Sequence, residues 1–141
     1  MLRTFALVLG LFTASCTTLA PRHVMNSFVD AFNRLAAADL RPLLAEDATA
    51  FLPMPQHPEL VRGRDEILAI LAPLLEADRQ RRNGQPLNLV PKDIVIQQHG
   101  RSAVVTFDVG TAEVHSRRTL VLERRGGRWM IIHLHASNVR P

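Results

Sequence analysis

The 141-residue sequence has the length of one domain, enough for a single hydrophobic core and too short for two. Hydrophobic residues make up 47% and charged residues 21%, close to the globular average, which argues against disorder along the whole chain. The net charge of +4 comes from 17 basic and 13 acidic residues, and the basic residues are spread out without interleaved aromatic residues, so we expect no nucleic-acid partner.

The first residues have the three parts of an export signal. Arg3 supplies a positive charge, Thr4–Ala14 is apolar, and two small residues precede Cys16, the single cysteine of the chain. This pattern resembles a bacterial lipoprotein signal, although Thr13 stands where such signals favour leucine. One cysteine also excludes an internal disulfide framework and a multi-cysteine metal site.

We therefore expect a signal peptide over 1–15, a tether over 16–21 and a domain over 22–141. Cys16 would carry the lipid, and that anchor would be the protein's contact with a membrane. The expected location is the bacterial cell envelope, lipid-anchored or periplasmic. Two alternatives are plain secretion, with cleavage near Ala20, and a buried N-terminal helix with an incidental cysteine.

Helices are predicted in the first part of the domain. Apolar residues at three- and four-residue spacing predict a helix over Asn26–Leu40, and Pro42 suits the first turn of a shorter helical segment after it. Ala48–Met54 reads as a short strand, and Pro55–Gly63 reads as a loop. A second long helix is predicted over Asp65–Arg82.

From Leu87 onward the apolar pattern alternates, which is typical of strands. The predicted strands are Asp93–His99, Ser102–Val109, Glu113–Arg125 and Arg128–Ser137, joined in part by tight glycine turns. Helices followed by a meander of antiparallel strands indicate the α+β class.

The order of several short motifs resembles the nuclear-transport-factor-2-like superfamily, and within it SnoaL-like domains. The stretches Ala31–Asn33, Leu44–Phe51 and Val61–Ile67 are similar to the opening of such domains, and Arg124–Ser137 is similar to their last hairpin and to that of the calcium/calmodulin-dependent kinase association domain. The resemblance implies a cone: a curved antiparallel sheet wrapped around three N-terminal helices, also described as a cystatin-like roll.

The resemblance implies two kinds of function. Some relatives are isomerases, cyclases or dehydratases that act on small molecules in the cone, and others are non-catalytic modules that dimerise or bind a ligand. Leu52 stands where ketosteroid-isomerase relatives have their carboxylate base, and the sequence has no tyrosine to serve as their oxyanion donor. Leu120 and Ala136 stand where the kinase association domain has pocket arginines, so we do not expect that domain's carboxylate-binding pocket at these positions.

We expect a small apolar or partly polar molecule in the cone, and no cofactor or metal. The expected lining of the cone is apolar and comprises Phe28, Phe32, Phe51, Leu52, Met54, Ile132 and Leu134. A core filled by the same side chains is the alternative.

Two residues are candidates for acid–base chemistry. Asp108 lies in an apolar strand, and burial there would raise the pKa of its carboxyl toward that of a general base. Alternatively it pairs at the surface with Arg117 or Arg118. His57 lies in the loop that caps the cone mouth in relatives, where it would face substrate or simply be an exposed loop histidine.

The last strand carries two histidines at alternate positions. His133 and His135 share a predicted face with Trp129, and we expect this face to lie outside the cone, in a homodimer interface. Alternatively the histidines are polar groups of the pocket, or metal ligands together with a third residue such as His115.

Overall fold

The computed structural model describes residues 19–110 and 115–139. The expected signal peptide, Cys16 and the start of the tether lie outside these residues. No helix of the described ranges is long and apolar enough to cross a membrane.

The first helix, α1, spans Leu19–Asn33 and therefore begins and ends earlier than the sequence pattern predicts. It ends because Leu35 adopts a left-handed backbone conformation, with φ of 56°. The N–H of Ala36 then donates to the carbonyl of Ala31, which is the closing bond of a Schellman motif. The stripe of Met25, Phe28 and their neighbours is buried, so the expected amphipathic packing is present.

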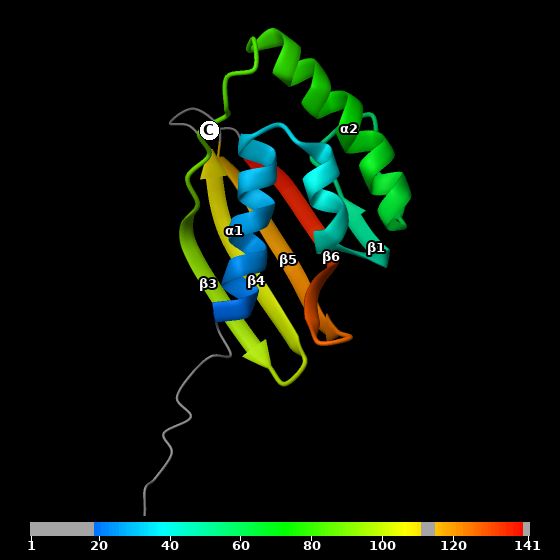
Figure 1. Ribbon diagram of the computed structural model, residues 1–141, viewed down its shortest axis with the longest axis vertical. Helices are drawn as coiled ribbons and strands as arrows, with labels where there is room; N and C mark the ends of the chain where they lie inside the picture. Colours follow the sequence, from blue (N-terminus) through cyan, green and yellow to red (C-terminus); the bar gives the residue numbers. More distant parts are fainter. Residues whose placement is uncertain (1–18, 111–114, 140–141) are drawn as a thin grey trace, which may run out of the picture.

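A 3₁₀ helix, η1, spans Ala37–Leu43 and contains Pro42. The second long helix, α2, spans Arg64–Arg81 and lies across the end of the sheet that contains the first strand. Its buried residues Ile67, Leu71 and Leu75 recur at four-residue spacing, which is the pattern of one helix face. Figure 1 shows α1 covering one face of the curved sheet and α2 flanking it.

The sheet has six strands in the order β2-β1-β6-β5-β4-β3. Their bounds are Leu44–Phe51 for β1, Val61–Arg62 for β2, Lys92–His99 for β3, Ser102–Gly110 for β4, His115–Arg125 for β5 and Arg128–Val139 for β6. The predicted α+β order is confirmed. Two details differ: β1 pairs with β6 in parallel, and the expected loop contains the short strand β2.

The tight turn between β5 and β6 is confirmed. Gly126 and Gly127 have φ of 55° and 79°, the left-handed values that a two-residue type I′ hairpin turn needs at both central positions. Arg125 pairs with Arg128 across the turn. The turn therefore fixes the register from which the rest of the β5–β6 pair follows.

A β-bulge in β6 decides which side chains face α1. Leu122 pairs with Ile131, whereas Val121 pairs with His133, so Ile132 is an extra residue. Because of this shift, Ile131 and Leu134 both point to the face covered by α1, which we call the inner face. The opposite face, which carries His133 and His135, is the outer face.

The core lies between the inner face and the helices. The fully buried residues of this core include Met25 of α1, Val105 of β4, Leu120 and Leu122 of β5, and Ile131 of β6. Alternate residues of the central strands therefore define the inner face, as a period of two requires.

Candidate functional site

Two neighbouring cavities lie between the inner face and α1. The larger has a volume of about 100 Å³ and is lined by residues of both helices and the sheet, among them Phe28, Leu71 and Leu134. The smaller has a volume of about 30 Å³ and is bordered by Val29, Leu89 and Phe107. Phe28, Phe32 and Arg118 line both cavities, so the two form one candidate site.

The aromatic pair of α1 forms the helical wall of the site. The ring centroids of Phe28 and Phe32 lie 4.9 Å apart in a tilted arrangement, because residues four apart on a helix share a face. Asn33 forms two hydrogen bonds with the backbone of Leu89, which borders the smaller cavity: its side-chain Nδ2 donates to the Leu89 carbonyl at 3.0 Å, and the Leu89 N–H donates to its Oδ1 at 2.6 Å. These two bonds hold the segment that precedes β3 against the end of α1.

Arg118 brings a positive charge into this apolar site. It pairs with Ala136 across β5 and β6 and lies on the same face as Leu120, so its side chain points toward α1. Its Nη1 donates to the carbonyl of Arg117 at 3.0 Å. Within the described ranges, no carboxylate lies within ion-pair distance of its guanidinium.

Burial lowers the pKa of Arg118 to about 10, because the apolar surroundings disfavour the charged form. The group nevertheless remains protonated near neutral pH. A partly buried cation with one backbone acceptor has unused hydrogen-bond donors that an anionic group could satisfy.

This position of Arg118 is not among the sequence-based predictions, in which Arg118 is only an alternative surface partner for Asp108. The signal that could have found it is the alternation of β5, which puts residue 118 on the face of Leu120 and Leu122. Arg118 reaches the cavity from a position two residues before Leu120.

The expected lining residues divide into two groups. Phe28, Phe32, Leu52, Met54 and Leu134 line the larger cavity. Phe51 lies instead on the outer face, where it is 40% exposed, because β1 alternates and buries Ala50. Ile132 is the extra residue of the β-bulge, and the inner position is taken by Ile131.

Neither acid–base candidate reaches the two cavities. Asp108 pairs in register with Arg117 and alternates with the buried residues Phe107 and Val109, so it lies on the outer face. It therefore does not sit where a base for a bound ligand would have to be. His57 is exposed in the loop after β1, where a hollow of about 280 Å³ runs along Gln56–Val61.

The two histidines of β6 lie on the outer face with Phe51. The ring of Phe51 is 6.0 Å from that of His133 and 5.8 Å from that of His135. The Nδ1 of His133 also forms a hydrogen bond of 2.8 Å with the Thr49 hydroxyl. Desolvation, with a smaller contribution from the charge of His135, lowers the pKa of His133.

Trp129, expected on the same face as these histidines, lies on the opposite one. It precedes the β-bulge, shares a face with Ile131 and packs against the core. The third metal ligand considered, His115, pairs with Val139 at the far end of β6. Among the described residues no three His, Cys, Asp or Glu side chains are grouped closely enough to hold a metal ion.

Comparisons with known proteins agree with this architecture. A family model described as a SnoaL-like domain matches residues 22–141. An NTF2-like protein of unknown function from Pseudomonas putida KT2440 has 18% sequence identity and a TM-score of 0.72, with 86% of this chain and 85% of that chain covered. No curated protein sequence matches.

Two further solved structures carry names that suggest an activity. A candidate dehydratase of the NTF2-like family from Streptomyces avermitilis has 18% identity and a TM-score of 0.71, covering 89% of this chain and 97% of that one. A candidate ketosteroid isomerase from Parabacteroides distasonis has 19% identity and a TM-score of 0.67, covering 86% and 89%. At this level of identity the likeness shows the NTF2-like fold, and the predicted fold class is thereby confirmed.

Proposed function

The chain belongs to the SnoaL-like domain family, and on that premise we propose that its interior cavity binds a small molecule with an apolar body and a carboxylate. The observation that carries the proposal is Arg118, which lines both cavities without a carboxylate partner within the described ranges. A ligand carboxylate would supply the acceptors that its guanidinium lacks.

The size of the cavity limits the apolar part of the ligand. The larger cavity holds about 100 Å³ and the smaller about 30 Å³. An apolar cavity of about 150 Å³ takes up a benzene-sized molecule. The two cavities together approach that size, so a single ring or a short aliphatic chain is the largest apolar body that would fit between Phe28, Phe32 and Leu134, with its acid group beside Arg118.

Binding is better supported than catalysis at this site. General acid–base catalysis needs a group that gains and loses a proton near the working pH. Among the described residues that line these two cavities, Arg118 is the charged one, and with a pKa of about 10 it stays protonated near neutral pH. An isomerase, cyclase or dehydratase activity would need a further proton-transfer group, which the ligand or a conformational change would have to supply.

Calorimetric titration with matched ligands tests the proposal. We expect benzoate and hexanoate to bind more tightly than benzyl alcohol and hexanol, which have similar apolar bodies and no charge. A hydrogen bond to a charged group contributes about 1.5–3 kcal/mol, so Arg118→Gln should weaken carboxylate binding by roughly 10- to 100-fold. Binding of the alcohols should change much less.

Arg117→Gln is the matched control, because Arg117 neighbours Arg118 in sequence and lies on the outer face. It should leave carboxylate binding unchanged. Equal binding of acids and alcohols by the wild-type protein, or an equal loss in both variants, would contradict the proposal.

A second candidate function, homodimerisation, is favoured by a different observation. Phe51 is 40% exposed on the outer face and lies against two histidine rings, an apolar and aromatic surface that a second copy of the chain could cover. Light scattering should then show a dimer at micromolar concentration, and Phe51→Glu should shift it toward monomer. A monomeric wild-type protein would remove this candidate.

The proposed location is the bacterial cell envelope, through a lipid on Cys16. The support is the arrangement of Arg3, the apolar segment 4–14 and Cys16 in the sequence. Labelled palmitate should enter the wild-type protein and not the Cys16→Ala variant. A periplasmic protein whose first residue lies at Ala20 or later would refute the lipid anchor.

A further inference from the structure

Two hairpin turns and the start of α1 lie at one end of the long axis of the molecule (Figure 1). The β3–β4 turn and the β5–β6 turn contact each other directly: the Arg124 N–H donates to the Arg101 carbonyl at 2.8 Å. The Arg101 side chain donates to the Arg124 carbonyl through Nε at 3.3 Å and Nη2 at 3.0 Å. We call residues 20–23, 99–102 and 124–128 together the turn end.

The turn end has an excess of positive charge. Four exposed arginines, namely Arg22, Arg101, Arg124 and Arg128, belong to it. Within the described part of the chain, none of the four has a carboxylate within ion-pair distance. Their charges therefore remain available to an external anionic surface.

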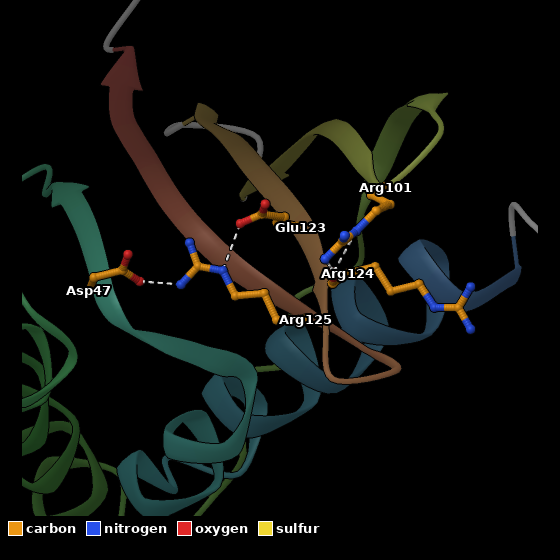
Figure 2. Close-up of polar contacts among 5 residues, drawn as sticks. All are labelled: Asp47, Arg101, Glu123, Arg124 and Arg125. Carbon is orange, nitrogen blue, oxygen red and sulfur yellow. Dashed lines mark hydrogen bonds and ion pairs between the residues drawn. The ribbon is translucent and has the colours of Figure 1, made fainter.

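In the same turn, the charge of Arg125 is neutralised by two carboxylates. Its Nη1 lies 2.5 Å from Asp47 and its Nε lies 2.6 Å from Glu123, as Figure 2 shows. The same view shows the guanidinium of Arg124 directed away from both carboxylates. The two acids of this region are thus engaged by Arg125 and leave the other four arginines uncompensated.

The sequence before α1 limits how far the turn end can be from a membrane. Thr4–Ala14 is apolar, and Cys16 is three residues before Leu19, the first residue of α1. Three extended residues span at most about 11 Å, which is close to the screening length of about 8–10 Å in physiological salt. If this segment or a lipid on Cys16 enters a bilayer, the turn end comes within electrostatic range of its surface.

We propose that the turn end is a docking surface for an anionic lipid bilayer. Four uncompensated arginines complement phosphate headgroups, and the same end carries the connection to the apolar N-terminal segment. A nucleic acid is less well matched, because the turn end has no Phe, Tyr or Trp side chain on which bases could stack, and its aromatic rings are the imidazoles of His23 and His99. The proposal does not depend on what the cavity binds.

Docking in this way would leave the cavity away from the lipid. Phe28 and Phe32 lie in the second half of α1, and Leu52–Met54 follow the end of β1, whereas the turn end contains the start of α1. Arg118 lies near the start of β5, far along the strand from the β5–β6 turn. The candidate site would thus be held over the membrane with its lining at the opposite end of the molecule.

Vesicle sedimentation of the full chain carrying Cys16→Ala tests the proposal without an acyl anchor. Vesicles of phosphatidylcholine are compared with vesicles that also contain phosphatidylglycerol, because the apolar segment should bind both and the charges should favour the second. Each arginine near an anionic surface strengthens binding roughly five-fold, so Arg101→Gln/Arg124→Gln/Arg128→Gln should weaken binding to anionic vesicles roughly 100-fold. Raising the salt from about 0.1 M to about 1 M should weaken wild-type binding similarly.

The control variant Arg62→Gln/Arg82→Gln/Arg117→Gln removes the same number of charges outside the turn end. It should lose much less affinity than the turn-end variant, even though both have the same net charge. Because the Arg101 side chain donates to the Arg124 carbonyl, the triple variant could also disturb the fold. A second variant, Arg22→Gln/Arg128→Gln, changes two exposed side chains that have no ion-pair partner among the described residues, and its binding to anionic vesicles should weaken roughly 25-fold. Equal losses in turn-end and control variants, or tighter binding of the wild type to duplex DNA than to anionic vesicles, would overturn the proposal.

Discussion

Arg118 and Arg125 lie on the same strand, β5, and are in opposite electrostatic situations. Arg125 is on the outer face, where Asp47 and Glu123 hydrogen-bond to it and raise the pKa of its guanidinium. Arg118 is on the inner face, where burial lowers its pKa to about 10 and no carboxylate of the described ranges compensates it.

The difference shows how one side-chain type serves two purposes. Arg125 connects β1 to the β5–β6 turn, so both its charge and its geometry are used within the fold. Arg118 is kept charged in apolar surroundings, which costs free energy that an anionic ligand can recover. A partly buried cation without a carboxylate partner is therefore a better indicator of a binding site than a paired one.

The largest predicted change in the free energy of unfolding comes from a substitution on the inner face of β5, compared with one on its outer face. Leu120 is fully buried on the inner face, and its neighbour Val121 is partly exposed on the outer face. Leu120→Ala should lower the free energy of unfolding by about 2–5 kcal/mol, and Val121→Ala by about 1 kcal/mol or less, in urea denaturation. Similar losses in both variants would mean that the outer face is covered, for example in a dimer.

The next largest change in stability is predicted for Arg118 and Arg125, and its sign should differ between the two residues. Arg118→Met keeps the length of the side chain and removes the desolvated charge, so it should raise the free energy of unfolding by roughly 1–3 kcal/mol. Arg125→Met removes two ion pairs at the surface and should lower the melting temperature slightly. Calorimetric unfolding of both variants measures the predicted difference in sign. A less stable Arg118→Met protein would show that Arg118 serves the fold and not a ligand.

A smaller effect is expected from the outer-face histidine. The pKa of His133 is lowered in the folded protein from its usual 6.5, so the unfolded chain binds the proton more readily. The stability that the neutral ring contributes is therefore fully present above pH 6.5 and is lost as the pH falls through the folded-state pKa. Denaturation between pH 7.5 and 5, about the range where histidine titrates, should show this loss in the wild type.

His133→Gln should reduce that pH dependence, because it removes the titrating ring and leaves a polar side chain near Thr49. His99→Gln is the control, since His99 is exposed at the end of β3. If the stability of His133→Gln depended on pH as much as that of the wild type, His133 would not be the group whose titration causes the pH dependence.

The smallest predicted change in stability is that caused by substituting Asp47. Its hydrogen bond from Arg125 lowers the pKa of the carboxyl below 3.8, so the contribution to stability is present above that pH and is lost as the pH falls through the lowered value. Asp47→Asn should lower the melting temperature slightly at neutral pH and have no effect in strong acid. Glu46→Gln changes a neighbouring exposed carboxylate and should leave the melting temperature unchanged at both pH values.

Local patterns were enough to locate most of the elements. The second long helix, the four strands after Leu87 and the Gly126-Gly127 turn follow from apolar periodicity and from the backbone freedom of glycine, which are properties of neighbouring residues. The end of α1 at Asn33 was misjudged, because the left-handed turn at Leu35 has no glycine to indicate it.

The sequence by itself determined the α+β class, the family resemblance and most of the apolar lining, because these depend on the order and spacing of residue types. Only the tertiary structure decided which face each residue of β6 occupies. One extra residue at Ile132 reverses the alternation in β6, placing Ile131 with Leu134 inside and separating Trp129 from His133. The register between β5 and β6 likewise brought Arg118 next to Ala136 and so into the cavity, a position that depends on hydrogen bonds between strands and on the helix packed above them.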